Sequence, residues 1–370
     1  WFEPGGSVEV MGSMQCPFYV HHALAHALGL PEDKVRVRPS VIGGGFGGKE
    51  DYPSLIAIHA ALLARASRRP VKMVYDRHED ILATTKRHPG RVRLRTGVAG
   101  DGRLIAMEIE VDLDGGAFRT LSPVVLSRGV LHATGAYRCP HVKIRGRVLR
   151  TNTPPNGAFR GFGAPQTIYA AERHMDRIGR VLGIDPLTLR LANAVGPGDS
   201  LATGQVLRAD ASARLCLDRI EKKTNFRARW LDCERARGAR KEGEPLRGIG
   251  LSLYLHGSGF TGLGEHRMRS PVTVRLTAEG RIEVLTAMTD IGQGSLAALS
   301  LIAADAAGVN LEDITLAPAD TSVVPDSGPT VASRTTMVVG GAISRAVAEL
   351  REQVLRWAQE RHGADLRVDE

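Results

Sequence analysis

The sequence predicts a mixed α+β protein with two related lobes. At 370 residues, the chain is longer than a single hydrophobic core usually supports, and 43% hydrophobic with 24% charged residues is a globular composition. A strand–helix–strand pattern occurs twice, near the start and in the last third of the sequence. Between the copies, extended and helical segments follow one another without the uninterrupted βαβαβ series of a doubly wound sheet.

The two copies, residues 8–37 and 282–316, share one order of signals. Each has a short strand, a helix of small apolar residues, a glycine that stops the helix, an acidic turn and a second strand. A loop of small residues follows each copy, over 43–48 and over 325–333. If the copies are related, these loops are equivalent, and we expect them to face one shared site.

Outside the two copies, the spacing of apolar residues predicts further helices and strands. The further expected elements, in chain order, are a helix over 55–66, strands over 91–96 and 104–113 with a Gly-Asp-Gly turn between them, helices over 170–182 and 186–193, strands over 246–255 and 272–285, and a helix over 341–362. The charged stretch 225–245 is interrupted by glycines and a proline, so it predicts a linker between lobes at 1–224 and 246–370.

Charge and cysteine content narrow the class of function. The formal charge is +9, but the arginines are scattered and not grouped with aromatic residues, which disfavours nucleic-acid binding. No apolar run approaches the roughly 18 residues that cross a bilayer. The four cysteines lack CxxC spacing, so this chain alone builds neither an iron–sulfur cluster nor a zinc ribbon, and reduced thiols in a cytoplasmic protein are expected.

Residues 43–50 (GGGFGGKE) have five glycines in six positions. They match the G-x-G-x-x-G dinucleotide pattern, but the preceding strand alternates valine with arginine and ends at Pro39, unlike a buried Rossmann strand. They match the P-loop pattern as far as Lys49, but Glu50 stands where a hydroxyl must bind magnesium. A plain glycine-rich turn is the third interpretation. In every case, free backbone N–H groups beside a helix start suit an anion or an oxo ligand.

Residues 153–166 are the second unusual segment, because two prolines lead into Arg160 and two phenylalanines set among glycines. The arginine offers a fork of donors, and the phenylalanines offer flat apolar faces to a planar ligand. Five motifs carry a family resemblance: GGGFGGKE at 43–50, RHP at 87–89, AFRGFGAPQ at 158–166, GQG at 292–294 and PTVAS at 329–333. In this order, they resemble the large, molybdenum-binding subunit of the xanthine dehydrogenase and aldehyde oxidase family of molybdenum hydroxylases.

The resemblance implies a multi-lobed molybdopterin-binding domain and a molybdenum–molybdopterin cofactor, in its plain or its cytosine dinucleotide form. The protein then contacts the cofactor largely through backbone amides, which glycines leave accessible. The main chain at Phe46, Arg160 and Ala332 is expected to approach the metal ligands. The other residues that match cofactor-binding positions are Gly45, Gly47, Gly292, Gln293 and Ser333.

The same resemblance implies a substrate. Glu50 matches the glutamate that hydrogen-bonds a purine ring, and Arg128 matches the arginine that stabilises charge on that ring. Phe162 matches one of two aromatic residues that enclose the ring, and Phe260, next to Thr261, is the expected second. Because aldehyde oxidases usually lack the glutamate–arginine pair, its presence favours a xanthine-like or other N-heteroaromatic substrate. The lack of cysteine in 158–160 argues against carbon monoxide dehydrogenase activity.

Two pieces of the family pattern are expected outside the chain. The general base is a glutamate in a Gly-Glu-Pro segment, and Glu244 has that tripeptide only in the presumed linker. A Gly-Gly-Gln motif is expected before Trp1. The resemblance thus covers the middle of a longer subunit, truncated at both ends, and this chain alone is not expected to turn over. Iron–sulfur clusters and FAD are expected on partner domains or subunits of a hetero-oligomer.

The sequence therefore predicts part of an oxidoreductase that hydroxylates an N-heteroaromatic ring with water-derived oxygen. Three alternatives stay open: an aldehyde oxidase-type activity, an NAD- or ATP-binding protein that uses residues 43–49, and a non-catalytic partner module.

Overall fold

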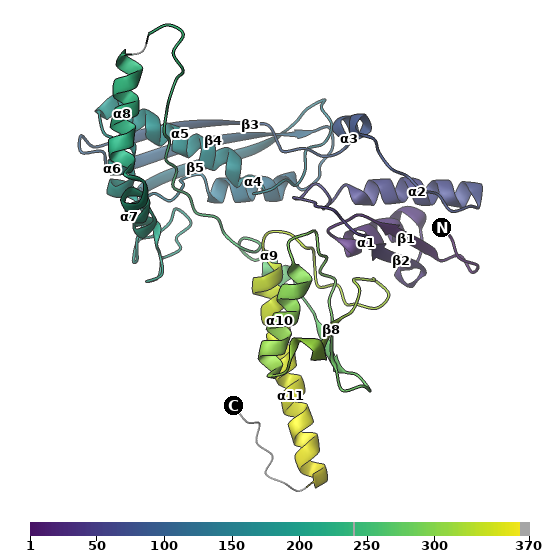
Figure 1. Cartoon of the computed structure of the whole chain (residues 1–370). Helices are drawn as coiled ribbons and strands as arrows, with labels where there is room; N and C mark the ends of the chain where they lie inside the picture. Colours follow the sequence, from purple (N-terminus) through teal and green to yellow (C-terminus); the bar gives the residue numbers. More distant parts are fainter. Residues whose placement is uncertain (240, 363–370) are drawn as a thin grey trace. The chain divides into compact units, whose positions relative to one another are not determined.

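The computed structural model describes residues 1–239 and 241–362 (Figure 1). They divide into two compact units. Unit 1 consists of Trp1–Lys86, Gly157–Arg160 and the chain from Gly257 onward, and unit 2 of Arg87–Asn156 and Gly161–His256. Both repeat copies therefore fall in unit 1. The units follow a division other than the expected lobes at 1–224 and 246–370, whose limits stay a prediction.

The first copy forms the predicted strand–helix–strand unit. Strand β1 (Val8–Gly12) pairs in parallel with β2 (Val35–Pro39), and α1 (Pro17–Leu28) crosses between them. Gly29 ends α1 in the left-handed region, at φ 65°, where glycine has no Cβ penalty. Apolar side chains of β1, α1 and β2 pack together into one core, which helix α2 (Pro53–Ser67) completes.

The second copy repeats this arrangement. Strand β7 (Ile282–Leu285) pairs in parallel with β8 (Ile314–Leu316), α10 (Ser295–Ala307) crosses between them, and Gly308 ends the helix at φ 71°. The predicted repeat is therefore confirmed at the level of elements. Strand β6 (Thr273–Leu276) adds an antiparallel edge, and the long helix α11 (Gly340–His362) packs against α10.

The two copies contact each other within unit 1. Arg36 on β2 makes a bidentate ion pair with Asp320, which follows β8, and Nη2 lies 2.5 Å from Oδ2. The N–H of Thr321 donates to the Val37 carbonyl at 3.1 Å, and the Val37 N–H donates to the Thr321 hydroxyl at 2.9 Å. Because β2 also pairs with β1, these bonds tie the second copy to the edge of the first sheet.

The remaining helices of unit 1 are short. Helix α3 (Arg77–Ala83) begins at a capping box, in which the Asp76 carboxylate accepts from the Glu79 N–H and Glu79 accepts from the Asp76 N–H. Helix α9 (Gly264–Met268) follows the segment that contains Phe260.

Unit 2 is built on a three-stranded sheet in the order β3–β4–β5. Strand β3 (Gly90–Val98) pairs antiparallel with β4 (Leu104–Gly116), as predicted, and β5 (His141–Arg150) pairs with β4 in parallel. Alternate residues of β4 are buried, because helices lie against one face of the sheet and charged pairs such as Arg147–Asp112 occupy the other. The helices of unit 2 are α4 (Ser122–Leu131), α5 (Ala164–Leu182), α6 (Pro186–Asn193), α7 (Ala213–Thr224) and α8 (Phe226–Ala239).

Two expectations differ from the structure. Residues 246–255 form no strand. The Leu253 N–H donates to the Glu172 carboxylate at 2.8 Å, so a side chain accepts the hydrogen bond that a neighbouring strand would accept in a sheet. Most of the presumed linker 225–245 is helix α8, which Phe226 anchors in the core while pairs such as Arg237–Glu234 line its surface. Within the described residues, no helix combines the length and the apolar character needed to cross a membrane.

Candidate functional site

The glycine-rich loop 43–48 needs glycine at specific positions. A Cβ at Gly45 would lie 2.4 Å from the Gln15 side-chain oxygen, and one at Gly47 would lie 3.1 Å from the Phe159 backbone. Phe46 itself has φ 53°, an uncommon value for a residue with a Cβ, and its side chain is 59% exposed. Lys49 donates to the Ser13 hydroxyl at 2.7 Å and to the Ile42 carbonyl at 2.6 Å. This lysine therefore braces the loop and does not reach outward as a P-loop lysine would.

Gln15 joins the two loops that follow the repeat copies. Its side-chain oxygen accepts from the Gly47 N–H at 2.9 Å, and its amide nitrogen donates to the Thr330 carbonyl at 3.0 Å. The Gln15 carbonyl also accepts from the Thr330 N–H and from the Thr289 hydroxyl, each at 3.3 Å. One buried side chain thus joins loops 43–48 and 325–333, and the shared site that these loops are expected to face stays a prediction. Sequence reasoning missed Gln15, because a single glutamine after a strand carries no pattern.

The structure brings the side chains of Arg160 and Phe46 together; their expected approach to a cofactor stays a prediction. The Arg160 guanidinium carbon lies 5.8 Å from the centre of the Phe46 ring. The Gly157 N–H donates to the Lys86 carbonyl at 3.0 Å, and a Cβ at Gly157 would lie 2.7 Å from Thr85. The Gly157 contacts thus hold this segment to residues 85–86, and the Arg160–Phe46 contact joins it to the glycine-rich loop within unit 1.

Loop 325–333 carries Ala332 and Ser333, both at φ 54°. The Ala332 carbonyl accepts from the Gly259 N–H at 2.7 Å, so Phe260 and Thr261 follow directly after a contact with this loop. The Gln293 side chain turns back on its own loop: its oxygen accepts from the Ile291 N–H at 2.7 Å, and its nitrogen lies 3.4 Å from the Thr289 carbonyl. Gly292, at φ 99°, allows that turn.

Glu50 is a buried acid at the end of the glycine-rich loop. It is 3% exposed, and no hydrogen bond to its carboxyl group is found among residues 1–239 and 241–362. Burial raises its pKa to about 8, and the neighbouring Asp51 carboxylate adds to the shift. Burial also raises the pKa of Asp51, and that of the buried Cys16 thiol well above its usual value, with Glu50 contributing to the Cys16 shift. The loop thus ends in an acid that is neutral near pH 7.

In unit 2, the structure joins Arg128 and Phe162 through the contact between α4 and α5. Arg128 lies on α4 and is 3% exposed, and the Thr167 hydroxyl of α5 donates to the Gly129 carbonyl at 2.8 Å. A Cβ at Gly163 would lie 2.1 Å from the Val125 carbonyl, so only glycine lets the AFRGFG segment approach α4. Phe162 has φ 51°.

Two histidines that the sequence analysis did not single out lie beside Arg128. Burial lowers the pKa of His132, and burial together with the Arg128 charge lowers that of His256. The His132 ring nitrogen Nδ1 lies 2.8 Å from the Arg128 carbonyl. Both rings are therefore neutral at pH 7. Glu244 is exposed, accepts from the Lys241 N–H at 3.2 Å and stays outside this group.

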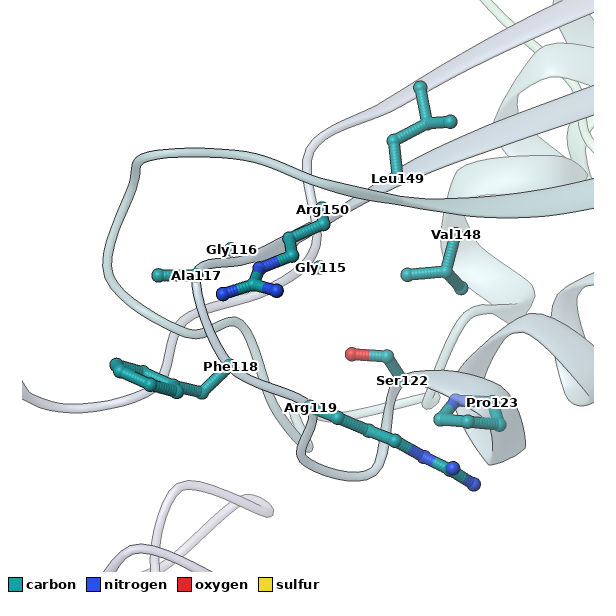
Figure 2. A pocket seen from close by; sticks show the side chains of 10 residues that line it. All are labelled: Gly115, Gly116, Ala117, Phe118, Arg119, Ser122, Pro123, Val148, Leu149 and Arg150. Carbon is teal, nitrogen blue, oxygen red and sulfur yellow. The ribbon is translucent and has the colours of Figure 1, made fainter.

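Unit 2 also contains a cavity of about 590 Å³ between the start of α4 and the end of β5 (Figure 2). Phe118, Arg119 and Arg150 line it, and Ser122 at its wall has its hydroxyl 2.7 Å from the His88 ring nitrogen. None of the residues predicted for the site lines this cavity.

Backbone strain concentrates at the predicted residues. Among the described residues, seven non-glycine residues have positive φ, and Phe46, Phe162, Ala332 and Ser333 are four of them. Such conformations cost of the order of 1 kcal/mol or more each and cluster where backbone groups serve a ligand. No acceptor for the N–H groups of Phe46, Ala332 or Ser333 is found in the part of the chain that the structure describes. Exposed amides in left-handed turns suit a ligand with anionic oxygens.

Comparison with known proteins gives family matches over both halves of the chain. Two family profiles, each described as a molybdopterin cofactor-binding domain, match residues 1–194 and 220–370. A relative from Bacillus subtilis (strain 168), a probable xanthine dehydrogenase subunit, is 35% identical over 361 residues, which are 96% of this chain and 47% of that protein. The chain thus spans about half of that relative.

Solved structures share the fold. Quinoline 2-oxidoreductase from Pseudomonas putida 86 superimposes with a TM-score of 0.83 at 29% identity, over 97% of this chain and 46% of that one. The aldehyde oxidoreductase of Desulfovibrio gigas superimposes with a TM-score of 0.81 at 30% identity, over 95% of this chain and 38% of that one.

Proposed function

Since the chain belongs to the molybdopterin cofactor-binding family, as a segment of a molybdenum hydroxylase large subunit, we propose that its complete assembly hydroxylates an N-heteroaromatic ring. The observation that carries this proposal is Glu50, a buried carboxyl group that is neutral near pH 7. A neutral acid both donates and accepts a hydrogen bond, which suits the nitrogen and N–H groups of such a ring. An aldehyde offers no ring nitrogen for it to bind.

The residues present fit the cofactor that this family binds. When bound, a molybdenum cofactor supplies two-electron redox chemistry and a water-derived oxygen. The N–H groups of Phe46, Ala332 and Ser333 would donate to oxygen atoms of the cofactor, and the glycine loop leaves room for close backbone approach. Gly45, Gly47, Gly292, Gln293 and Arg160 complete the proposed cofactor contacts. Gln15 would keep two of these loops in register.

We assign the substrate contacts to five residues. Glu50 would bind the ring edge, and Arg128 would stabilise negative charge that develops on the ring. Phe162 and Phe260, with Thr261, would enclose the ring faces. Burial lowers the pKa of His132 and, with the Arg128 charge, that of His256, so the two rings add no positive charge beside the Arg128 guanidinium at pH 7.

The electrons would leave through iron–sulfur clusters to FAD on partner domains or subunits, in a hetero-oligomer. The molybdopterin would be present in its plain form or in its cytosine dinucleotide form. An aldehyde substrate is the second candidate, and the match to the Desulfovibrio gigas aldehyde oxidoreductase favours it.

The test compares Glu50→Ala and Arg128→Ala with the wild type in the complete assembly, with xanthine and a small aldehyde as substrates. We expect each variant to keep its molybdenum, by elemental analysis, and to lose xanthine turnover by at least about 100-fold, because a polar contact to the reacting ring is lost. The aldehyde serves as the control, since it lacks the ring. The substrate assignment would be overturned if Glu50→Ala and Arg128→Ala kept wild-type xanthine turnover, or if the wild type oxidised the aldehyde and not xanthine. An assembly without molybdenum would overturn the proposed chemistry.

A further inference from the structure

Arg334 is a fully buried arginine directly after the left-handed turn at Ala332 and Ser333. Its side chain is 0% exposed, and its Nε donates to the Glu265 carboxylate at 3.1 Å. Its Nη1 donates to the Ser327 carbonyl at 3.0 Å and lies 3.3 Å from the Pro329 carbonyl, and its Nη2 donates to the Ser270 hydroxyl. One guanidinium thus binds loop 325–333 at two carbonyls and α9 at one carboxylate.

Glu265 extends this contact to the Phe260 segment. Its Oε1 accepts from the Phe260 N–H at 2.8 Å, while Oε2 accepts from Arg334. A Cβ at Gly259 would lie 3.1 Å from this carboxylate, and the Gly259 N–H donates to the Ala332 carbonyl at 2.7 Å. The Glu265–Arg334 pair and this backbone bond therefore close a ring of contacts around residues 259–265 and 327–334.

The Glu265–Arg334 ion pair contacts the Phe260 segment through Glu265 and loop 325–333 through Arg334. If Arg334 only stabilised the fold, its acceptors could come from any neighbouring segment. Both carbonyls that Arg334 binds belong to loop 325–333. Arg334 is also the N-cap of a π-helical turn, Thr335–Val339. Such turns are rare and often occur at functional sites. The guanidinium is rigid and planar, so it fixes the direction of the carbonyls as well as their distance.

We infer that Glu265 and Arg334 are positioning residues that hold the Phe260–Thr261 segment in register with the Ala332–Ser333 turn. This inference rests on the proposed function, in which Phe260 faces the substrate and Ala332 faces the cofactor. A shift of one segment against the other would move the ring-binding face away from the reacting centre, and small displacements of this kind reduce turnover strongly.

Unit 2 offers a matched control. There Glu172 also binds a fully buried arginine, Arg190, at 2.9 Å, and its Oε2 also accepts a backbone N–H, that of Leu253, at 2.8 Å. Glu172→Gln and Glu265→Gln therefore remove the same charge beside a fully buried arginine, although Arg190 keeps a second carboxylate, that of Asp176. In both, the new amide NH2 has no acceptor to bind on the guanidinium. Only the Glu265 pair touches the predicted site segments.

The experiment measures hydrogen exchange by mass spectrometry in the complete assembly, for the wild type, Glu265→Gln and Glu172→Gln. We expect exchange in 257–261 and 327–333 to accelerate together in Glu265→Gln, by about 10-fold for one lost hydrogen bond. Glu172→Gln is expected to leave both segments unchanged. Arg334→Lys, which keeps the charge but cannot reach all four partners, is expected to give the same paired acceleration.

Kinetics supply the second readout. Glu265→Gln is expected to lower kcat/KM for the heteroaromatic substrate about 10-fold, mainly through kcat, with a smaller change in molybdenum content, while Glu172→Gln keeps the wild-type kcat/KM. Exchange that accelerates in only one of the two segments, or equally in both glutamine variants, would refute the positioning role. A paired acceleration in an assembly that oxidises no heteroaromatic ring would refute the proposed function and leave the positioning role intact.

Discussion

Glu50 shows how burial sets the state of a single carboxyl group. Its pKa rises from 4.5 to about 8, so the acid is neutral in the folded chain where it would be ionised in the unfolded chain. The stability that the neutral form contributes is complete below pH 4.5 and is lost as the pH rises through 8. Between pH 6 and 9, we expect the wild type to lose about 3 kcal/mol more unfolding free energy than Glu50→Gln. Urea unfolding of both proteins measures this, and equal pH dependences would contradict it.

Single residues were predictable where they stood in a motif. Phe46, Ala332 and Ser333 were identified by family resemblance, and their left-handed backbone supports that assignment without testing their role. Gln15, Glu265 and Arg334 were not found, although they make the hydrogen bonds that hold those residues. Their partners lie 315 residues away for Gln15 and 69 for Glu265, and no local pattern records contacts of that range.

At the scale of elements, two glycines of one loop should differ sharply. Gly47 and Gly43 both have positive φ, at 93° and 68°, but a Cβ at Gly47 would press on the Phe159 backbone, while a Cβ at Gly43 would meet nothing within 4 Å. We expect Gly47→Ala to destabilise unit 1 by about 2 kcal/mol more than Gly43→Ala, because backbone must move to admit the methyl group. It should also lower molybdenum content. Thermal unfolding and elemental analysis check this, and equal effects of the two substitutions would count against a close approach of the loops.

Helices and paired strands followed their sequence patterns closely. The glycines at 29 and 308 end their helices as expected, and the Gly-Asp-Gly turn between β3 and β4 joins them as an antiparallel pair. The errors have physical causes. The stretch 246–255 has strand-like composition, but its Leu253 N–H bonds a buried carboxylate. The charges within 226–239 suggested an irregular segment, yet pairs such as Arg237–Glu234 lie on the surface of helix α8; whether this segment links two lobes stays a prediction.

At the scale of the molecule, the repeat was readable but its assembly was not. The sequence indicated two similar strand–helix–strand units and did not indicate that both would fall in one compact unit, separated by the residues of another. Element patterns depend on neighbours within a few positions, whereas the joining of the copies depends on side chains far apart in the chain, such as Arg36 and Asp320, which are 284 residues apart.

The Arg36–Asp320 pair should therefore carry measurable coupling between the copies. Arg36 donates from both Nε and Nη2, and these bonds hold the pKa of Asp320 below its usual value although burial opposes the shift. In a double-mutant cycle with Arg36→Met and Asp320→Asn, we expect a coupling of about 1 kcal/mol at pH 7, reduced from a buried pair's value because the arginine side chain is 44% exposed.

This coupling should disappear as the pH falls through the folded pKa of Asp320, since the protonated acid no longer attracts the guanidinium. The exposed pair Arg275–Glu283 joins neighbouring strands β6 and β7 and serves as the reference, with an expected coupling below about 0.5 kcal/mol. Urea unfolding of the single and double variants gives both values. If the two couplings are equal, the long-range pair is an ordinary surface contact, and the backbone bonds at Val37 and Thr321 join the copies without it.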